Sequence, residues 1–147
     1  MVCAIWRGAY GDCVEGWSAI AQWTGAPLAS ILNLAGVSVD AKFTVLYCAD
    51  NLDGDDLKGG ERSAGRYYES HDVSESFHPQ TILAYAMNGQ PLDVAHGAPL
   101  RLRLERQLGY KHAKYVERIR ITDSLADIHG GRGGDWEDRG YEWYAGI

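Results

Sequence analysis

Short apolar stretches separated by glycine, proline and acidic residues alternate along most of this sequence. The segment Pro27–Ala35 places Leu28, Ile31 and Leu32 at helical spacing. Proline suits the first turn of a helix, and Gly36 follows as a natural terminator. We therefore predict a short amphipathic helix over this segment.

Other segments carry the β-branched, aromatic or alternating pattern that is typical of strands. They are Lys42–Cys48, Arg66–Asp72, Leu83–Met87, Gln90–Val94 and Tyr115–Ile121. The Asn88-Gly89 pair between the third and the fourth of these predicts a two-residue hairpin turn. In a further segment, leucines at 100, 102 and 104 alternate with Arg101 and Arg103, which predicts a half-buried strand with one basic, solvated face.

These short strands, with one or two helices and no regular strand–helix alternation, favour an α+β fold. Neither a Gly-x-Gly-x-x-Gly nor a Walker A motif occurs. Residues 49–65 are acidic and glycine-rich; because their spacing does not match an EF-hand, we expect a solvated loop and not a calcium site. Residues 127–147 combine glycines with Trp and Tyr, so we expect an irregular tail that docks on the core.

The length of 147 residues and the composition, with 46% hydrophobic and 23% charged residues, are those of one globular domain. The net charge of -6 argues against binding of nucleic acid or an anionic membrane. No apolar run is long enough to span a bilayer, and no signal peptide is recognisable over Met1–Asp12. The three cysteines, Cys3, Cys13 and Cys48, form no Cys-x-x-Cys pair, which argues against a disulfide framework or a structural zinc site.

Two parts of the sequence are candidates for chemistry. Cys13, in the run Cys-Val-Glu-Gly-Trp-Ser, offers a soft thiolate ligand for a transition metal, with Glu15 two residues later. The segments 96–101 and 109–111 supply His96, Arg101 and Lys111, which are suited to an anionic group. Each has an ordinary alternative: a cysteine is most often buried as a small apolar residue, and a strand arginine is most often solvated.

The order of several motifs resembles the molybdopterin-binding domain of the sulfite oxidase family. The resemblance rests on the Cys13 segment, on Trp-Thr-Gly-Ala-Pro-Leu at 23–28, on His-Pro-Gln-Thr at 78–81, on Asn88-Gly89, on 96–101 and 108–111, and on the aromatic tail 136–144. It covers nearly all of the chain from Gly11 onward. The resemblance implies one domain over 1–147 with the sulfite-oxidase-type molybdopterin-binding fold, and molybdopterin as the cofactor.

The resemblance also implies roles for particular residues. Cys13 would be the metal ligand and a catalytic residue. Glu15 would be the second catalytic residue, near the metal, where it could shape substrate binding or deliver protons; the alternative is a surface carboxylate. The cofactor-binding residues would be Cys48, His96, Arg101, Gly109, Tyr110 and Lys111. In this assignment the Arg101 guanidinium and the Lys111 ammonium would hold the pterin phosphate, and Gly109 would let the backbone approach closely.

The function implied is oxygen-atom transfer to or from a sulfite-like or sulfoxide-like substrate. Electrons would pass through a separate partner, and the relatives suggest a periplasmic location. Because family members have a segment before the ligating cysteine, we expect an N-terminally shortened domain with a more open pocket. Two alternatives stay open: a binding module that keeps the fold without cofactor, and a hydrolase with a cysteine nucleophile, which would need a histidine beside Cys13.

Overall fold

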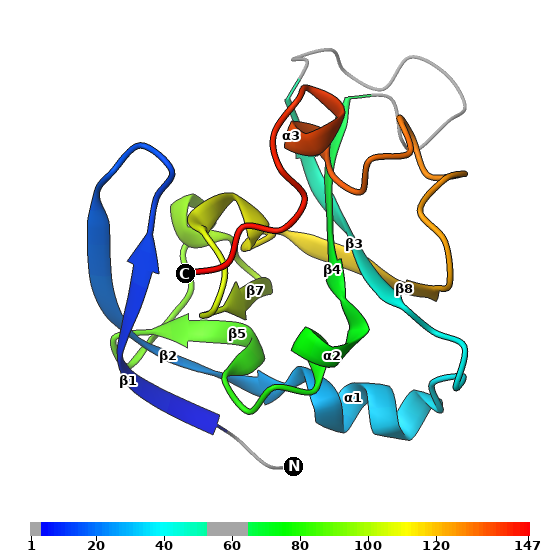
Figure 1. Cartoon of the computed structure of the whole chain (residues 1–147). Helices are drawn as coiled ribbons and strands as arrows, with labels where there is room; N and C mark the ends of the chain where they lie inside the picture. Colours follow the sequence, from blue (N-terminus) through cyan, green and yellow to red (C-terminus); the bar gives the residue numbers. More distant parts are fainter. Residues whose placement is uncertain (1–3, 53–64) are drawn as a thin grey trace.

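Two antiparallel β-sheets dominate the computed structural model, which describes residues 4–52 and 65–147 (Figure 1). The first sheet has the order β1-β2-β5-β6, and β7 pairs with β5 as well; its strands are β1 (Ala4–Asp12), β2 (Ser18–Pro27), β5 (Thr81–Met87), β6 (Gln90–Pro91) and β7 (Arg101–Leu104). The second has the order β4-β3-β8; its strands are β3 (Phe43–Asn51), β4 (Arg66–Asp72) and β8 (Val116–Thr122).

Short helices connect and flank these strands. They are α1 (Leu28–Ala35), α2 (Val73–Ser76), α3 (Asp135–Asp138) and the 3₁₀ helices η1 (Val94–His96) and η2 (Gly109–Lys111). Antiparallel sheets with few helices confirm the predicted α+β class. Within the described residues, no helix is long and apolar enough to cross a membrane.

The predicted helix is confirmed as α1. Leu28 and Leu32 are buried, and Gly36 ends the helix with a positive φ of 75° while its N–H donates to the Leu32 carbonyl. The hairpin at Asn88-Gly89 is confirmed too, with φ values of 52° and 78° at the two turn residues. Its second strand ends at Pro91, before the expected Val94.

Two strands escaped prediction, β1 and β2. Of the ten residues of β2 only Trp23 and Gly25 are buried, and the sequence of this strand lacks the clear apolar alternation of the other strands.

The prediction for β7 was right about the alternation of its side chains and wrong about the exposure of its arginines. The side chains of β7 alternate between two sides, but Arg101 and Arg103 are 7% and 5% exposed, so their side of the strand is buried.

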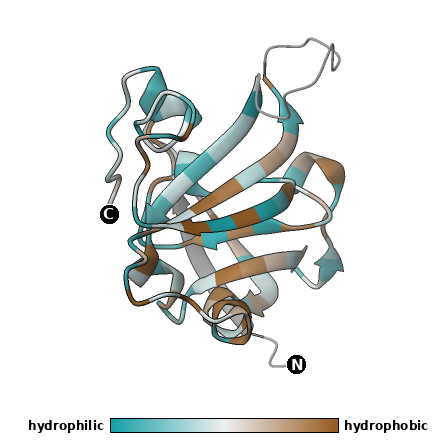
Figure 2. Cartoon of the chain, turned by 90° about the vertical axis from the view of Figure 1, so that its right-hand side faces the viewer, coloured by the Kyte–Doolittle hydropathy of each residue, from teal (hydrophilic) through white to brown (hydrophobic). Residues whose placement is uncertain are grey.

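The main core lies where the two sheets and α1 meet. It contains Leu28, Leu32, Leu46, Leu83, Leu102 and Leu104. Figure 2 shows the underlying pattern, with hydrophobic and hydrophilic residues alternating along the strands. This core holds β7 so that its leucines face inward and its arginines face the opposite side.

The C-terminal segment, residues 127–147, lies against both sheets (Figure 1). The Trp143 indole donates to the Ser70 hydroxyl at 2.8 Å, and the Ala145 N–H donates to the Gln107 side chain at 2.9 Å. In the same segment, α3 packs against β4, and Glu137 of α3 contacts Lys111 of η2. Of the acidic stretch predicted as a loop, β3 takes up the beginning as far as Asn51, and 53–64 lie outside the described residues.

Candidate functional site

A cavity of about 740 Å³ opens beside the turn between β1 and β2. Its walls come from this turn, from β2 and β7, from the segments around η1 and η2, and from the C-terminal segment. The polar and aromatic residues that line it are Asp12, Cys13, Glu15, Trp17, Trp23, Asn88, His96, Arg101, Arg103, Tyr110, His112, Lys114, Trp136 and Tyr141. A volume of this size is typical of a cofactor site.

The structure brings together most of the residues predicted for the site. Six of the eight line this one cavity: Cys13, Glu15, His96, Arg101, Gly109 and Tyr110. The other two, Cys48 and Lys111, do not line it.

Cys13 is placed by the turn that follows β1. Its N–H donates to the Trp17 carbonyl and its carbonyl accepts from the Gly16 N–H, both at 2.9 Å. These hydrogen bonds within the turn hold the backbone around the thiol. The residue is half-buried and its thiol forms no disulfide. Glu15 is exposed at the rim, where its carboxylate accepts a long hydrogen bond of 3.4 Å from the Trp17 indole.

Gly109 packs directly against this turn. A Cβ at position 109 would lie 3.3 Å from the Asp12 carbonyl oxygen and 3.9 Å from the Cys13 Cα atom. The absence of a side chain therefore lets η2 approach the cysteine closely. The next residue, Tyr110, is held by its hydroxyl, which donates to the Glu142 carbonyl at 2.7 Å.

One wall of the cavity is a stack of cations and an indole. The guanidinium carbons of Arg101 and Arg103 lie 4.8 Å and 4.5 Å from the Trp23 ring centroid. Arg101 donates from Nη1 to the His96 carbonyl at 3.0 Å, whereas its buried Nε has no partner. Burial, together with the neighbouring Arg103, lowers the pKa of Arg101 to about 10, so the group is still a cation at neutral pH.

The cations of the cavity differ in how their charge is balanced. Arg103 donates from Nε and Nη2 to the two oxygens of Glu105, at 2.7 Å and 2.9 Å. Lys114 donates to the Ala95 carbonyl at 2.9 Å, and among the described residues no carboxylate pairs with it or with Arg101. Arg101 and Lys114 therefore keep charge that a bound anion can neutralise.

His112 offers the opposite kind of contact. It is 4% exposed, and burial, reinforced by the Arg103 charge, lowers the pKa of His112 well below its usual value, so the ring is neutral. Its Nε2 donates to the Gln107 carbonyl at 3.0 Å, which leaves Nδ1 as an acceptor. Nδ1 is buried and has no partner among the described residues.

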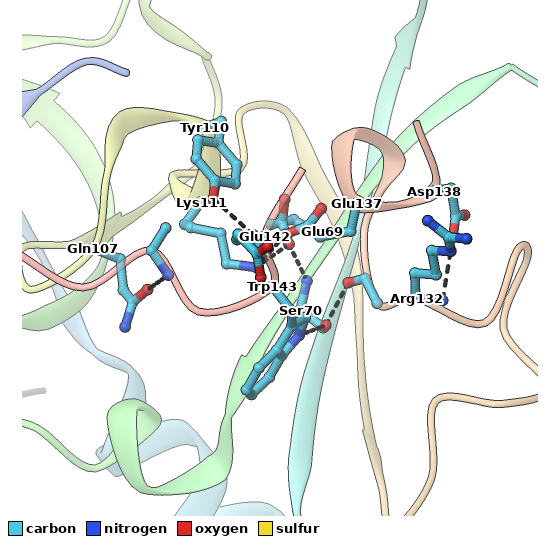
Figure 3. A network of polar contacts seen from close by, with 12 residues as sticks. Glu69, Ser70, Gln107, Tyr110, Lys111, Arg132, Glu137, Asp138, Glu142 and Trp143 are labelled. Atoms are coloured by element: carbon cyan, nitrogen blue, oxygen red, sulfur yellow. Dashed lines mark hydrogen bonds and ion pairs between the residues drawn. The ribbon is translucent and has the colours of Figure 1, made fainter. Parts of the chain in front are cut away.

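Lys111, expected at the phosphate, does not line this cavity. Its ammonium is 2.7 Å from Glu69 Oε1 and 2.5 Å from Glu137 Oε1, and all three side chains are 0–1% exposed (Figure 3). Two carboxylates already surround this cation, so it has no charge to offer the cavity.

Cys48, expected to touch the cofactor, lies in the main core at 1% exposure. Burial, with the nearby Asp50 and Glu69 carboxylates, raises the pKa of its thiol, so the group is a neutral thiol packed among apolar side chains. This is the ordinary role of a buried cysteine.

Three residues of the cavity were missed in the sequence: Arg103, His112 and Lys114. A signal for one of them is present in the sequence, because residues two apart in a strand point to the same side. Arg103 follows Arg101 by two on β7. Arginine is usually exposed, so the alternation alone predicts a solvated face and not a cavity wall.

The donor set fits one particular kind of ligand. Within the part of the chain that the structure describes, no three His, Cys, Asp or Glu residues gather to hold a metal ion by themselves. The cavity instead offers a single thiol, unpaired cations, a neutral acceptor and a wall of aromatic rings. Such a set suits an anionic heterocyclic cofactor whose metal takes one ligand from the protein.

Comparison with known proteins supports this interpretation. Residues 4–129 match the family described as the oxidoreductase molybdopterin binding domain. The chain is 40% identical over 134 residues to the "Putative protein-methionine-sulfoxide reductase subunit YedZ1" of Azospira oryzae. It is 34% identical over 118 residues to the protein-methionine-sulfoxide reductase catalytic subunit MsrP of Xanthomonas axonopodis pv. citri.

These matches cover 91% and 78% of this chain, but the chain spans only 43% and 36% of the length of the two relatives. The fold resembles that of the sulfane dehydrogenase SoxCD from Paracoccus pantotrophus, with a TM-score of 0.66 and 21% identity over 88% of this chain and 33% of that one.

Proposed function

This chain belongs to the oxidoreductase molybdopterin-binding domain family, and on that premise we propose that it supports oxygen-atom transfer at a molybdenum cofactor bound beside Cys13. The observation that carries the proposal is the cavity itself. One half-buried thiol lies in it together with two cations, Arg101 and Lys114, that form no ion pair with a carboxylate of the described residues. Bound there, the cofactor supplies the two-electron redox chemistry.

Each side chain has a specific task in this proposal. Cys13 gives its thiolate to the metal, and its closed turn fixes the direction of the sulfur. Arg101 and Lys114 bind the phosphate, and Arg101 offers its free Nε–H to an oxygen. His112 accepts a hydrogen bond from the pterin through Nδ1, and the ring of Trp23 gives the guanidinium groups a flat support.

For the substrate we propose a sulfoxide that carries organic groups, in preference to sulfite. Val14, Trp17 and Ile20 line the mouth of the cavity at 50%, 56% and 61% exposure, and an apolar rim suits organic substituents better than a small dianion. The names of the two relatives point the same way.

Reduction of a sulfoxide takes two electrons and two protons and yields a thioether and water. Glu15, exposed at the same rim, is the carboxyl group best placed to deliver protons from solvent. The electrons would come from a separate redox partner.

The test is to measure molybdenum and pterin content in protein produced in a host that makes the cofactor, for wild type and for Cys13→Ser. A hydroxyl does not replace a soft thiolate at neutral pH, so we expect Cys13→Ser to lose most of its metal and its turnover. The matched control is Cys48→Ala, which removes the other described thiol from outside the cavity and should retain metal.

Turnover with a reduced dye and an alkyl sulfoxide, compared with sulfite oxidation by ferricyanide, separates the two substrate classes. Equal metal content in wild type and Cys13→Ser would contradict the ligand assignment. A folded wild-type chain that never takes up pterin would favour a binding module that keeps the fold without cofactor.

A further inference from the structure

Three buried ionisable side chains lie outside the cavity and have no part in the function proposed above. Glu69 is on β4, Lys111 on η2 and Glu137 on α3, so the cluster joins three elements that are far apart in the sequence. Figure 3 shows the lysine reaching from η2 toward both carboxylates. The side chains are 0%, 1% and 1% exposed.

This arrangement is a costly way to hold three elements together. Two carboxyl groups face one ammonium, and Glu137 Oε2 is buried with no partner among the described residues. The Ser70 N–H donates to Glu69 Oε1 at 2.7 Å, and the Tyr67 hydroxyl lies 3.4 Å from Glu69 Oε2. Replacing buried ion clusters by apolar residues of similar volume is often neutral or stabilising, so bulk stability is a weak explanation for this one.

Two of the elements that carry the cluster, η2 and α3, also supply residues that line the cavity. On η2, Lys111 directly follows Tyr110, whose ring contacts Tyr141 edge-on at 5.4 Å, and Gly109, which packs on the Cys13 turn. On α3, Glu137 directly follows Trp136, whose ring lies 5.2 Å from the same Tyr141. The Tyr67 hydroxyl, beside Glu69, also donates to the Tyr110 carbonyl.

We propose that Glu69, Lys111 and Glu137 are positioning residues, which hold η2 and α3 in place so that Gly109, Tyr110 and Trp136 keep the cavity closed around Cys13. The lysine is an anchor between the two elements and not a ligand of the phosphate. The role of these residues at the cofactor site rests on the proposed function, but the test uses the cofactor-free chain.

The accessibility of the Cys13 thiol reports the position of η2 directly. In a Cys3→Ser background the remaining thiols are Cys13, half-buried in the cavity, and Cys48, buried in the core. Reaction with a disulfide reagent such as dithionitrobenzoate, followed by peptide mapping, gives a labelling rate for each. Cys13 reports local opening, whereas Cys48 reports unfolding of the whole domain.

The deciding variant combines Glu69→Gln, Lys111→Met and Glu137→Gln, which removes all charge at nearly constant volume, and we expect it to fold. It should raise the labelling rate of Cys13 about tenfold or more while Cys48 stays protected, as happens when local opening becomes about 1.4 kcal/mol easier. Lys111→Met alone is less suitable, because it also lowers the stability of the whole domain and so raises the Cys48 rate.

The matched control is Glu117→Gln, which breaks an exposed ion pair with Arg66 at the far end of β4 and should leave both rates unchanged. A folded triple variant with the wild-type Cys13 rate would overturn the proposal. An equal rise in the labelling rates of Cys13 and Cys48 would also overturn it, because the cluster would then stabilise the whole domain and not η2 and α3 in particular. A wild-type chain that binds no pterin would defeat the proposed function and leave these rates interpretable.

Discussion

Lys111 and Lys114 lie three residues apart on one segment, yet they occupy opposite electrostatic environments. Lys111 is 1% exposed and lies within 2.7 Å of one carboxylate and 2.5 Å of another. Lys114 lies at the cavity, donates to one backbone carbonyl, and pairs with no carboxylate among the described residues. Burial, and the charge of Arg101, lower the pKa of Lys114 from its usual value.

The difference shows that two lysines of one basic motif can differ in whether a carboxylate contacts them directly. Lys111 has two carboxyl groups in direct contact. Lys114 forms no ion pair among the described residues, so its charge is more accessible to a bound anion. The same contrast separates Arg103, which Glu105 neutralises, from Arg101.

The largest effect that we expect separates the two lysines by stability. Lys111→Met leaves two buried carboxylates without their cation, and breaking a buried pair in this way costs about 3–5 kcal/mol of unfolding free energy. Lys114→Met removes a partly solvated hydrogen bond and should cost less than about 1 kcal/mol. Urea unfolding of both variants measures the difference, and equal losses would end the distinction.

The pH dependence of stability tests the buried cluster around Lys111 in a second way. Burial, partly opposed by Lys111 and increased by Glu137, raises the pKa of Glu69 to about 8 in the folded chain. A raised folded pKa means that the folded state holds the proton more tightly, so this group contributes stability that is complete in acid and is lost as the pH rises toward about 8.

Glu69→Gln should abolish that loss, so the difference in unfolding free energy between wild type and variant should change steadily between about pH 4.5 and 8. Buried neutral His71, whose pKa falls to about 3, has the opposite effect on the pH dependence of stability below about pH 6.5. The wild-type curve alone would therefore not isolate the effect of Glu69. A pH-independent difference would show that Glu69 holds no extra proton.

On the cavity side, the expected effect is on cofactor retention and not on folding. Arg101→Ala or Lys114→Ala removes a charged partner of the proposed phosphate, worth about 1.5–3 kcal/mol of binding each. Pterin content after dialysis should fall for both variants, while the melting temperature of the cofactor-free protein stays close to that of wild type. Arg120→Ala, which removes an exposed cation of β8 outside the cavity, serves as the control.

The smallest effect concerns the exposed pair Arg66–Glu117, at 2.8 Å with side chains 19% and 51% exposed. Solvent screens such a pair, so Glu117→Gln should change the unfolding free energy by less than about 1 kcal/mol and should lose its effect in high salt. A loss comparable to that of Lys111→Met would mean that burial is not what distinguishes the internal cluster.

Local patterns in the sequence determined several elements of this protein. The apolar spacing of α1 and its glycine terminator, the Asn-Gly turn between β5 and β6, and the alternation along β7 are decided within a few residues, so they can be predicted. The order of motifs likewise identified the family and the cofactor before any contact was known.

Only the tertiary structure decided what each charged side chain does. Lys111 meets Glu69 from 42 residues away and Glu137 from 26 residues away, and no local pattern encodes that meeting. The same packing places the arginines of β7, which were expected on a solvated face, in the wall of the cavity. It places Cys48, which was expected to contact the cofactor, in the hydrophobic core. The type of a residue sets its possible charge, but its neighbours in space set whether that charge is balanced, buried or available to a ligand.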